Sequence, residues 1–483
     1  MRVFSLIHFA IVLIPTQPRA ADLFDHQEIR NPATLDVKVM QDWHEVAGLV
    51  PTRQKVINIL VHKVIPGKPY RIPVRFIVPQ DQKAKGFHLT GGHQLRQFEG
   101  DAKISRTDQA LIKRGVGRVH TMIQTLNQSD QAELGRALDT KFIETLDPKY
   151  SIQYYGWPLT LMKAITAAYA EGDHFEKSKI AMSGGSKNGA TPSSVLNVDD
   201  RTSAVHGGVS PIWDSPLRLC DEVQWEKLHS YNKNYAASVQ ASGKASRGRL
   251  LEHPFLGGTY GPIYNRRALA AGHSWEELKG LAEAMADNVF ISRNLKQLKA
   301  RGAEFLFQPG THDFVCFDLI WGGQHHPQIP LYLRANSGHG IKPSHPQSEK
   351  GQDNLSAFLY QHFFDGFEGN LLEAPVVNSE LIGNKLKVSV KFKAGSKTES
   401  GRIWWIYDRG PNGSAAYICE LFPEDQWADM KWDESAEAWT VEIPIEASHQ
   451  TIDFFSNHKK TLKYRGEELQ TFLSSPYQRV LLK

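Results

Sequence analysis

Apolar and polar positions along most of the chain follow two alternating periods, which predict strands and helices in turn. Short runs rich in Val, Ile, Leu and Phe, bounded by Gly, Pro or polar residues, are typical of strands. Residues 157–170 instead place Leu161 and Ile165 near one face, as an amphipathic helix does, and 188–198 and 354–364 are also helical in pattern. The predicted strands are 56–61, 70–78, 86–90, 115–123, 179–184, 204–209, 303–308 and 331–336. This alternation at short spacing is typical of a mostly parallel sheet covered by helices on both faces.

The pattern changes near residue 370. Residues 385–393 alternate strictly, with Leu386, Val388, Val390 and Phe392 on one face and polar side chains on the other. Period two without helical segments predicts an antiparallel, sandwich-like β domain with one face in water. Further strands of this kind are predicted at 402–407, 438–446 and 451–455.

These patterns divide the chain. We expect an α/β domain over 21–370 and a β-rich domain over 371–483. Residues 215–300 are polar and mostly helical in pattern, which suits a lid or an insertion within the first domain.

The first twenty residues have the layout of a secretory signal. Arg2 precedes an apolar run over 3–14, Pro15 ends the run, and Ala20 and Ala21 provide a small-residue cleavage site. The run is shorter than the roughly 20 residues that a helix needs to span a bilayer. We therefore expect residues 1–20 to be removed and the mature protein to be periplasmic or extracellular, without a transmembrane segment.

Charge and cysteine content exclude several classes of function. The 483 residues include 56 Lys and Arg against 52 Asp and Glu, a formal net charge of +4, which gives no reason to expect nucleic acid as a partner. The three cysteines are too few for a disulfide scaffold and lack metal-ligand spacing. His325 and His326 are adjacent, so their side chains point apart, and no His-Glu-x-x-His motif occurs. We expect neither a metal nor another cofactor.

The segment KIAMSGGSKNGATPSS at 179–194 carries the clearest chemical signal. A predicted strand leads into a glycine-rich turn with Ser186, and a predicted helix follows, as in the nucleophile elbow of α/β-hydrolases. The usual spacing is Gly-x-Ser-x-Gly, whereas here Asn188 stands at the last position and Gly189 follows one residue later. Ser183, still within the strand end, is a weaker candidate nucleophile.

A serine nucleophile needs a base and an acid, which follow it in α/β-hydrolases in the order Ser, Asp or Glu, His. Asp313 lies in the turn after the strand at 303–308, and His339 lies in the turn after the strand at 331–336. Both loops should lie at the sheet edge that holds Ser186, with His339 as base and Asp313 as its partner. Asp214 is the alternative acid and His345 the alternative base.

An oxyanion hole needs backbone N–H donors directed at the reacting carbonyl oxygen. The residue after the nucleophile, Lys187, should supply the first N–H. The second should come from the loop HLTGGHQ at 88–94, where Gly92 or His93 is the candidate. The Lys187 side chain is either a further positive charge near the oxyanion or a solvated lysine.

The elbow and the turns that end in Asp313 and His339 resemble the PhoPQ-activated pathogenicity-related protein family. The resemblance implies an exported α/β-hydrolase-like protein with a C-terminal β-rich region, and it places Ser186, Asp313 and His339 at the nucleophile, acid and base. That family commonly has Lys-Arg-Gly after the serine, where this chain has Lys-Asn-Gly. The Ser-Arg-Asn-Gly elbow of glucuronoyl esterases is also similar, so carbohydrate esters are among the expected substrates.

The sequence thus predicts a secreted serine hydrolase that cleaves carboxylic esters of small molecules or glycans through an acyl-enzyme. A serine peptidase is the alternative of the same class, with Arg218, Glu222 and Glu226 available to bind a peptide terminus. A third possibility is a non-catalytic binding protein on a hydrolase scaffold, whose β domain contacts a glycan or a cell surface.

Overall fold

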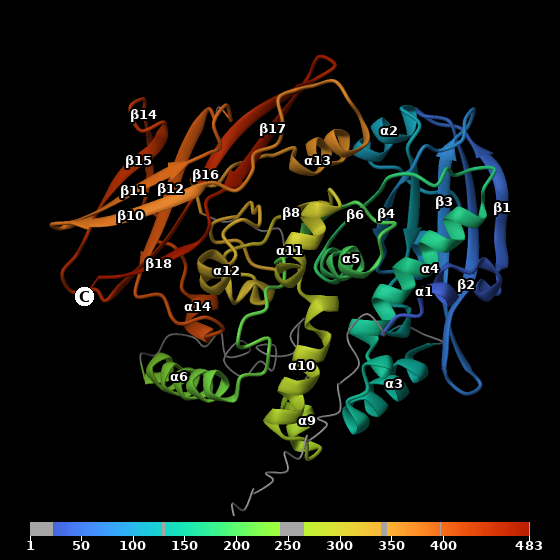
Figure 1. The fold of residues 1–483 in the computed structure, drawn as a ribbon, viewed down its shortest axis with the longest axis horizontal. Coiled ribbons are helices and arrows are strands. Elements are labelled where there is room, and N and C mark those ends of the chain that lie inside the picture. The colour runs from blue at the N-terminus through green and yellow to red at the C-terminus, as the bar shows by residue number, and fades with distance from the viewer. Residues whose placement is uncertain (1–22, 128–130, 242–264, 340–344, 397, 483) are drawn as a thin grey trace, which may run out of the picture.

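The computed structural model describes residues 23–127, 131–241, 265–339, 345–396 and 398–482 (Figure 1). The predicted signal at 1–20 lies outside the described residues. Among the described residues, no helix combines the length and the apolar character that a bilayer crossing requires.

The α/β domain is built on an eight-stranded sheet in the order β1-β2-β3-β5-β4-β6-β7-β8. Along the sheet, the pairs β5–β4, β4–β6, β6–β7 and β7–β8 are parallel. The pairs β1–β2, β2–β3 and β3–β5 are antiparallel. This order and direction are those of an α/β-hydrolase sheet with one added N-terminal strand and without its last strand, which confirms the predicted fold class. The strands are β1 Lys38–Val46, β2 Thr52–Ile65, β3 Lys68–Pro79, β4 Phe87–Gly91, β5 Gly117–Thr121, β6 Ile180–Gly185, β7 Ala204–Gly208 and β8 Glu304–Phe307.

Helices cover both faces of the sheet because successive strand residues point to opposite sides. In β6, Met182 belongs to the core shared with α4 Trp157–Ala170 and α5 Lys187–Val198. Its neighbour Ala181 belongs to the core shared with α2 Arg106–Lys113 and α13 Asn354–Phe363. The remaining helices are α1 His26–Arg30, α3 Ala132–Thr145, α6 Glu222–Ala241, α9 Asn265–Ala270, α10 Trp275–Val289, α11 Ile291–Ala300, α12 Leu319–His325 and α14 Ala415–Cys419.

Two parts of the sheet differ from the sequence prediction. β1 has no apolar period because it is an edge strand with exposed residues on both faces, so the sequence gives no sign of it. Residues 331–336 do not form a strand, and they meet β8 and the turn after it only through the isolated parallel bridges Phe307–Leu331 and Gly310–Arg334. Ser474 of the C-terminal domain bonds the Leu331 carbonyl oxygen and the Leu333 N–H, so these backbone groups are not available for pairing with a neighbouring strand.

The C-terminal domain contains two antiparallel sheets, as predicted. Leu386 and Val388 of the first pack with Ile403 and Phe454 of the second. In Figure 1 both sheets lie beyond β8, at the end of the central sheet opposite β1. The first sheet is β10 Val376–Ile382, β11 Lys385–Lys391, β15 Ala438–Pro444 and β14 Lys431–Asp433. The second is β13 Trp427–Asp429, β12 Ser400–Tyr407, β16 Thr451–Tyr464 and β17 Glu467–Ser474, with β18 Gln478–Leu481 and β9 Phe367–Glu368 paired to β16.

The described part of 215–300 is mostly helical. α10 and α11 pack against α5, so this half of the segment is the crossover between β7 and β8 and covers the sheet. α6 lies further out and contacts α14 of the C-terminal domain. Residues 242–264 of the predicted lid lie outside the described residues.

Three buried histidines are neutral at neutral pH. Burial lowers the pKa of His206 to about 4 and that of His458 to about 3, from an ordinary 6.5. Burial, and then the cations Arg118 and Arg75, lower the pKa of His120 to about 3. The unfolded chain therefore binds more protons than the folded chain between these values and 6.5.

The free energy of unfolding should consequently fall as the pH drops below about 6.5, by up to about 1.4 kcal/mol per pH unit for each of these imidazoles. Urea unfolding at about pH 7 and about pH 5 measures the slope. His206→Gln removes one titrating group and should make the slope shallower. Equal stability of the native protein at both pH values would contradict this assignment.

Candidate active site

Ser186 occupies a strained turn between β6 and α5. Its backbone has φ 53° and ψ −129°, a conformation that non-glycine residues seldom adopt and that is found where function requires it. A Cβ on Gly184 would lie 2.4 Å from the carbonyl oxygen of Asn188, and one on Gly189 would lie 2.4 Å from that of Gly184. Both glycines are therefore needed for the strand and helix to approach so closely, and Gly189 is the late glycine of the motif.

Asn188 fits at the unusual position because Gly91 of β4 leaves it room. A Cβ on Gly91 would lie 1.9 Å from Asn188 Oδ1. The Asn188 side chain is buried, and its Nδ2 lies 3.0 Å from His93 Nε2. Asn188 thus stands where the common motif has its second glycine, and Gly91 leaves the space that the larger side chain needs.

Gly91→Ala should lower the free energy of unfolding by roughly 1–3 kcal/mol, because the added methyl group meets the Asn188 amide. In the double variant Gly91→Ala/Asn188→Gly that clash is gone, so the two substitutions should cost less together than the sum of their separate effects. A double-mutant cycle by urea unfolding measures the coupling. Additive effects would show that the two positions do not share this space.

The structure brings the three predicted triad residues together. β6, β7 and β8 are parallel neighbours, so the loops that follow β6 and β8 meet at one sheet edge. His339 Nδ1 lies 2.9 Å from Asp313 Oδ1, and His339 Nε2 lies 2.8 Å from Ser186 Oγ. With Nδ1–H donating to the carboxylate, Nε2 is left to accept the serine proton. This arrangement suits nucleophilic attack with general-base assistance.

Asp313 is held firmly, whereas His339 is open to solvent. The Asp313 side chain caps the short 3-10 helix Phe314–Cys316 by accepting a 2.9 Å hydrogen bond from the Val315 N–H. Asp313 is buried, while 32% of the His339 side chain is exposed. The Phe314 ring lies 4.5 Å from the imidazole and limits its movement. Phe314 was not predicted from the sequence, although its place directly after Asp313 is a usable signal.

The alternative acid and base are engaged elsewhere. Asp214 contacts His326 Nε2 at 2.7 Å and Ser292 Oγ at 2.8 Å, and it pairs with Arg293 at 2.6 Å. Burial opposes the ionisation of Asp214, but these partners lower its pKa to about 2. The two ring nitrogens of His345 contact the Pro423 carbonyl oxygen and the Gln347 N–H, at 3.0 and 3.2 Å. Neither Asp214 nor His345 joins the cluster around Ser186.

Ser183 belongs to a second, buried Ser-His-Asp chain. Its Oγ lies 2.7 Å from His88 Nε2, and His88 Nδ1 lies 2.8 Å from Asp108 Oδ1. Burial opposes ionisation of Asp108, but His88 and the Arg118 guanidinium hold the pKa of this carboxyl well below its usual range. All three residues are buried, so a substrate cannot reach Ser183. This chain therefore ties β4, β6 and α2 together beneath the elbow.

The structure corrects the predicted second oxyanion donor. The Gly92 N–H donates to the Thr121 carbonyl oxygen at 2.5 Å, and the His93 N–H donates to Gln97 Oε1 at 2.8 Å. Both groups are already satisfied and are not available to a reacting carbonyl. The Lys187 N–H is at the first position of α5, where backbone N–H groups have no partner within the helix and the helix dipole favours negative charge.

The Lys187 side chain lies against an aromatic ring. Its Nζ is 5.4 Å from the centroid of the Trp157 ring, at the start of α4, and burial lowers its pKa. Among the described residues, no carboxylate lies within ion-pair distance of Lys187. The Lys187 side chain next to Ser186 is thus half-buried, and its charge has no carboxylate partner within the described part of the chain.

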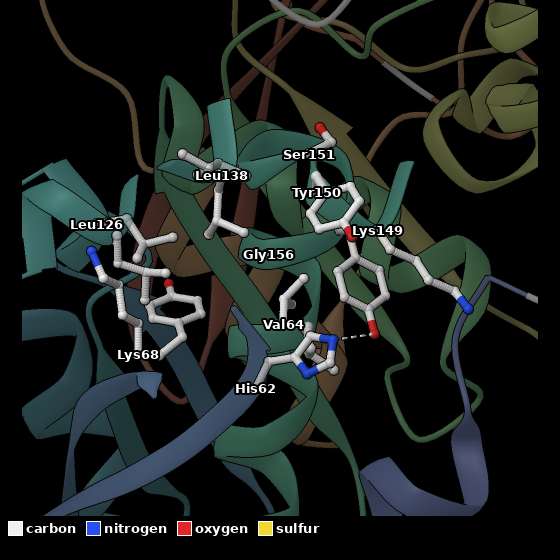
Figure 2. Close-up of a pocket in the computed structure, with 14 residues that line it drawn as sticks. His62, Val64, Lys68, Leu126, Leu138, Lys149, Tyr150, Ser151 and Gly156 are labelled. Atoms are coloured by element: carbon white, nitrogen blue, oxygen red, sulfur yellow. Dashed lines mark hydrogen bonds between the residues drawn. The ribbon is translucent and has the colours of Figure 1, made fainter. Parts of the chain in front are cut away.

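A small apolar pocket lies beside the segment that leads into α4, the π-helical turn Ile152–Gly156 (Figure 2). His62 and Tyr155 both line it, and the Tyr155 hydroxyl lies 3.2 Å from His62 Nε2. No triad residue lines this pocket. We therefore assign it to the packing beneath α4.

Two tryptophans, Trp213 after β7 and Trp321 after β8, have different surroundings. Trp213 is fully buried, and a Cβ on Gly322 would lie 2.2 Å from its ring, so Trp213 is a core residue. Trp321 is partly exposed and stacks on His325 at 3.6 Å. Within the described residues, no group of three or more His, Cys, Asp or Glu side chains could hold a metal ion.

No family model matches the chain, and no curated protein matches it. The PhoPQ-activated family therefore stays a prediction. Similar solved structures include an acetyl xylan esterase from Paenibacillus, with 14% identity over 66% of this chain and 87% of that chain and a TM-score of 0.38. A glucuronoyl esterase from Teredinibacter turnerae has 12% identity over 57% and 61% and a TM-score of 0.33. An acetyl xylan esterase from Thermoanaerobacterium has 11% identity over 70% and 93% and a TM-score of 0.36.

Proposed function

We propose that this protein is a serine hydrolase that cleaves carboxylic esters. The observation that carries the proposal is the continuous hydrogen-bonded chain from Asp313 through His339 to Ser186. The strained backbone at Ser186 supports it, because such strain at a serine between a strand and a helix serves to expose the hydroxyl.

In the proposed reaction, His339 Nε2 removes the Ser186 proton as Oγ attacks the ester carbonyl carbon. Asp313 holds the imidazole in the required tautomer and stabilises the imidazolium. The Lys187 N–H, at the N-terminus of α5, donates to the oxyanion. Collapse of the intermediate releases the alcohol, which takes the proton from His339, and leaves an acyl group on Ser186. Water activated by His339 then releases the acid and restores the serine.

The surroundings favour an ester over a peptide substrate. Arg218, one of the side chains considered for binding a peptide terminus, is buried and pairs with Asp318 at 2.7 Å. It also donates to the Val315 carbonyl oxygen at 2.6 Å. Glu222 and Glu226 are exposed on α6. These groups do not form a common charged pocket.

The experiment is a parallel activity screen. It uses p-nitrophenyl acetate, an acetylated xylo-oligosaccharide, a methyl glucuronate ester and aminoacyl p-nitroanilides. We expect hydrolysis of at least one ester class and little cleavage of the anilides. Cleavage of the anilides alone would favour the peptidase alternative, and the absence of any hydrolysis by folded protein would favour the non-catalytic one. Glycan esters are included because of the Ser-Lys-Asn-Gly elbow.

We also propose that the protein is exported, on the basis of the pattern in residues 1–20. Intact mass of the full chain expressed in a bacterial host tests this. A periplasmic product that begins near Ala21 supports export, and a cytoplasmic product with the intact N-terminus contradicts it.

A further inference from the structure

The C-terminal domain contacts both loops that carry the proposed acid and base. We name residues 308–313 the acid loop and residues 331–339 the base loop. The acid loop ends in Asp313 and the base loop ends in His339. Each loop forms hydrogen bonds with residues more than 80 positions later in the chain.

The acid loop is held through the two residues that directly precede Asp313. Arg409 Nη2 donates to the Thr311 carbonyl oxygen at 2.6 Å. His312 Nε2 donates to the Glu420 carbonyl oxygen at 2.5 Å. Thr311 and His312 are buried, so no water competes strongly for these bonds.

The base loop is held by two hydrogen bonds between the Asn336 side chain and the Phe422 backbone. Asn336 Nδ2 donates to the Phe422 carbonyl oxygen, and the Phe422 N–H donates back to Asn336 Oδ1, both at 2.8 Å. The Asn336 N–H also donates to Thr311 Oγ1 at 2.9 Å, which ties the two loops to each other. The start of the loop is fixed by Ser474, whose N–H and Oγ bond the backbone of Leu331 and Leu333 at 2.7 Å each.

Arg409 is suited to a fixed support. It is 2% exposed, and its guanidinium lies 3.7 Å from the centroid of the Tyr417 ring. It also donates to the Tyr417 carbonyl oxygen at 2.6 Å and to the Tyr477 hydroxyl at 2.7 Å. Among the described residues, no carboxylate lies within ion-pair distance of it. Because these contacts fix the planar Arg409 guanidinium, its hydrogen bond to the Thr311 carbonyl oxygen has a defined direction.

We propose that the C-terminal domain is an integral part of the catalytic apparatus, which positions Asp313 and His339 against Ser186 through Arg409, Asn336 and the Phe422 backbone. This inference rests on the proposed function. Arg409 and Asn336 are positioning residues, since they act through the loops and not on the substrate. The domain is consequently neither a dispensable appendage nor only a surface for binding glycans.

The test variant is Asn336→Gly. Asn336 has φ 59°, so glycine removes the amide contact without adding left-handed strain. Asn384→Gly is the control, because Asn384 is exposed in the turn between β10 and β11 of the C-terminal domain. Arg409→Lys is the second variant, which keeps the charge but loses the planar fork.

Two measurements on the full-length variants separate the possible results. Hydrogen–deuterium exchange reports whether the acid and base loops loosen, and it does not depend on activity. Ester turnover reports kcat and KM. We expect Asn336→Gly and Arg409→Lys to speed exchange in both loops and to lower kcat by about ten- to a hundredfold with little change in KM, because small displacements of catalytic groups act at this scale. Asn384→Gly should match the native protein in both respects.

Unchanged loop exchange in a folded Asn336→Gly protein would overturn the positioning role. Faster exchange with unchanged kcat would overturn it too, since the support would then be structural only. Loss of stability without a change in kcat for Arg409→Lys counts against it in the same way. A native protein with protected loops and no hydrolytic activity would instead overturn the proposed function, on which this inference rests.

Discussion

Replacing Ser186 with alanine is expected to lower kcat for ester hydrolysis by roughly 10⁴- to 10⁶-fold, because the reaction then has no nucleophile and no acyl-enzyme can form. Substrate affinity should change little. The measurement is the steady-state rate with the best substrate from the screen.

Ser183→Ala is the matched control for this prediction. Ser183 also contacts a histidine that is bonded to an aspartate, but it is buried. Its loss should leave kcat within a few-fold of the native value and lower the free energy of unfolding by about 1–3 kcal/mol, because His88 loses a buried partner. If Ser183→Ala lost activity and Ser186→Ala kept it, the nucleophile would be misassigned.

Asp313→Asn is expected to lower kcat by about 10⁴-fold while the fold is retained. An asparagine can still accept the hydrogen bond from the Val315 N–H through its oxygen. Because His339 Nδ1 contacts the same Oδ1 atom, that oxygen still faces the imidazole, and the variant loses the negative charge that stabilises the imidazolium when His339 takes the serine proton. The measurement is kcat at neutral pH, with thermal unfolding to confirm that the protein is folded.

Asp214→Asn separates the two candidate acids. Asp214 bonds His326, Ser292 and Arg293, so its replacement should cost stability and leave kcat within a few-fold of the native value. The reverse result, a large loss for Asp214→Asn and a small one for Asp313→Asn, would assign the acid to the loop after β7.

The grouping of Ser186, His339 and Asp313 could be predicted from sequence because it depends on local signals. Ser186 is marked by a strand, glycines and a helix within sixteen residues (179–194), and Asp313 and His339 each follow a strand-like run. Parallel pairing then brings the ends of β6 and β8 to one sheet edge.

The features that were missed depend on contacts that no sequence motif marks. Gly92 and His93 have the expected place in sequence, but Thr121 and the Gln97 side chain take their N–H groups. No motif links Arg409 to Thr311, which it contacts across 98 positions.

Strands were also predicted where a local apolar run marks them, and mispredicted where tertiary contacts decide. The buried strands have clear apolar runs, and β6, β7 and β8 lie close to their predicted ranges. β1 is exposed on both faces and leaves no period to detect. Residues 331–336 have the composition of a strand, but Ser474 takes part of their hydrogen bonding, so only isolated bridges to β8 and its following turn form.

The most direct test of the central claim is reaction of the protein with a fluorophosphonate, followed by peptide mapping to locate the adduct. An activated serine attacks the phosphorus and keeps the label, whereas an ordinary serine does not. We predict a single adduct on Ser186 that is absent from Ser186→Ala and strongly reduced in His339→Ala. A folded native protein that takes up no label, or that is labelled equally well without Ser186, would contradict the account.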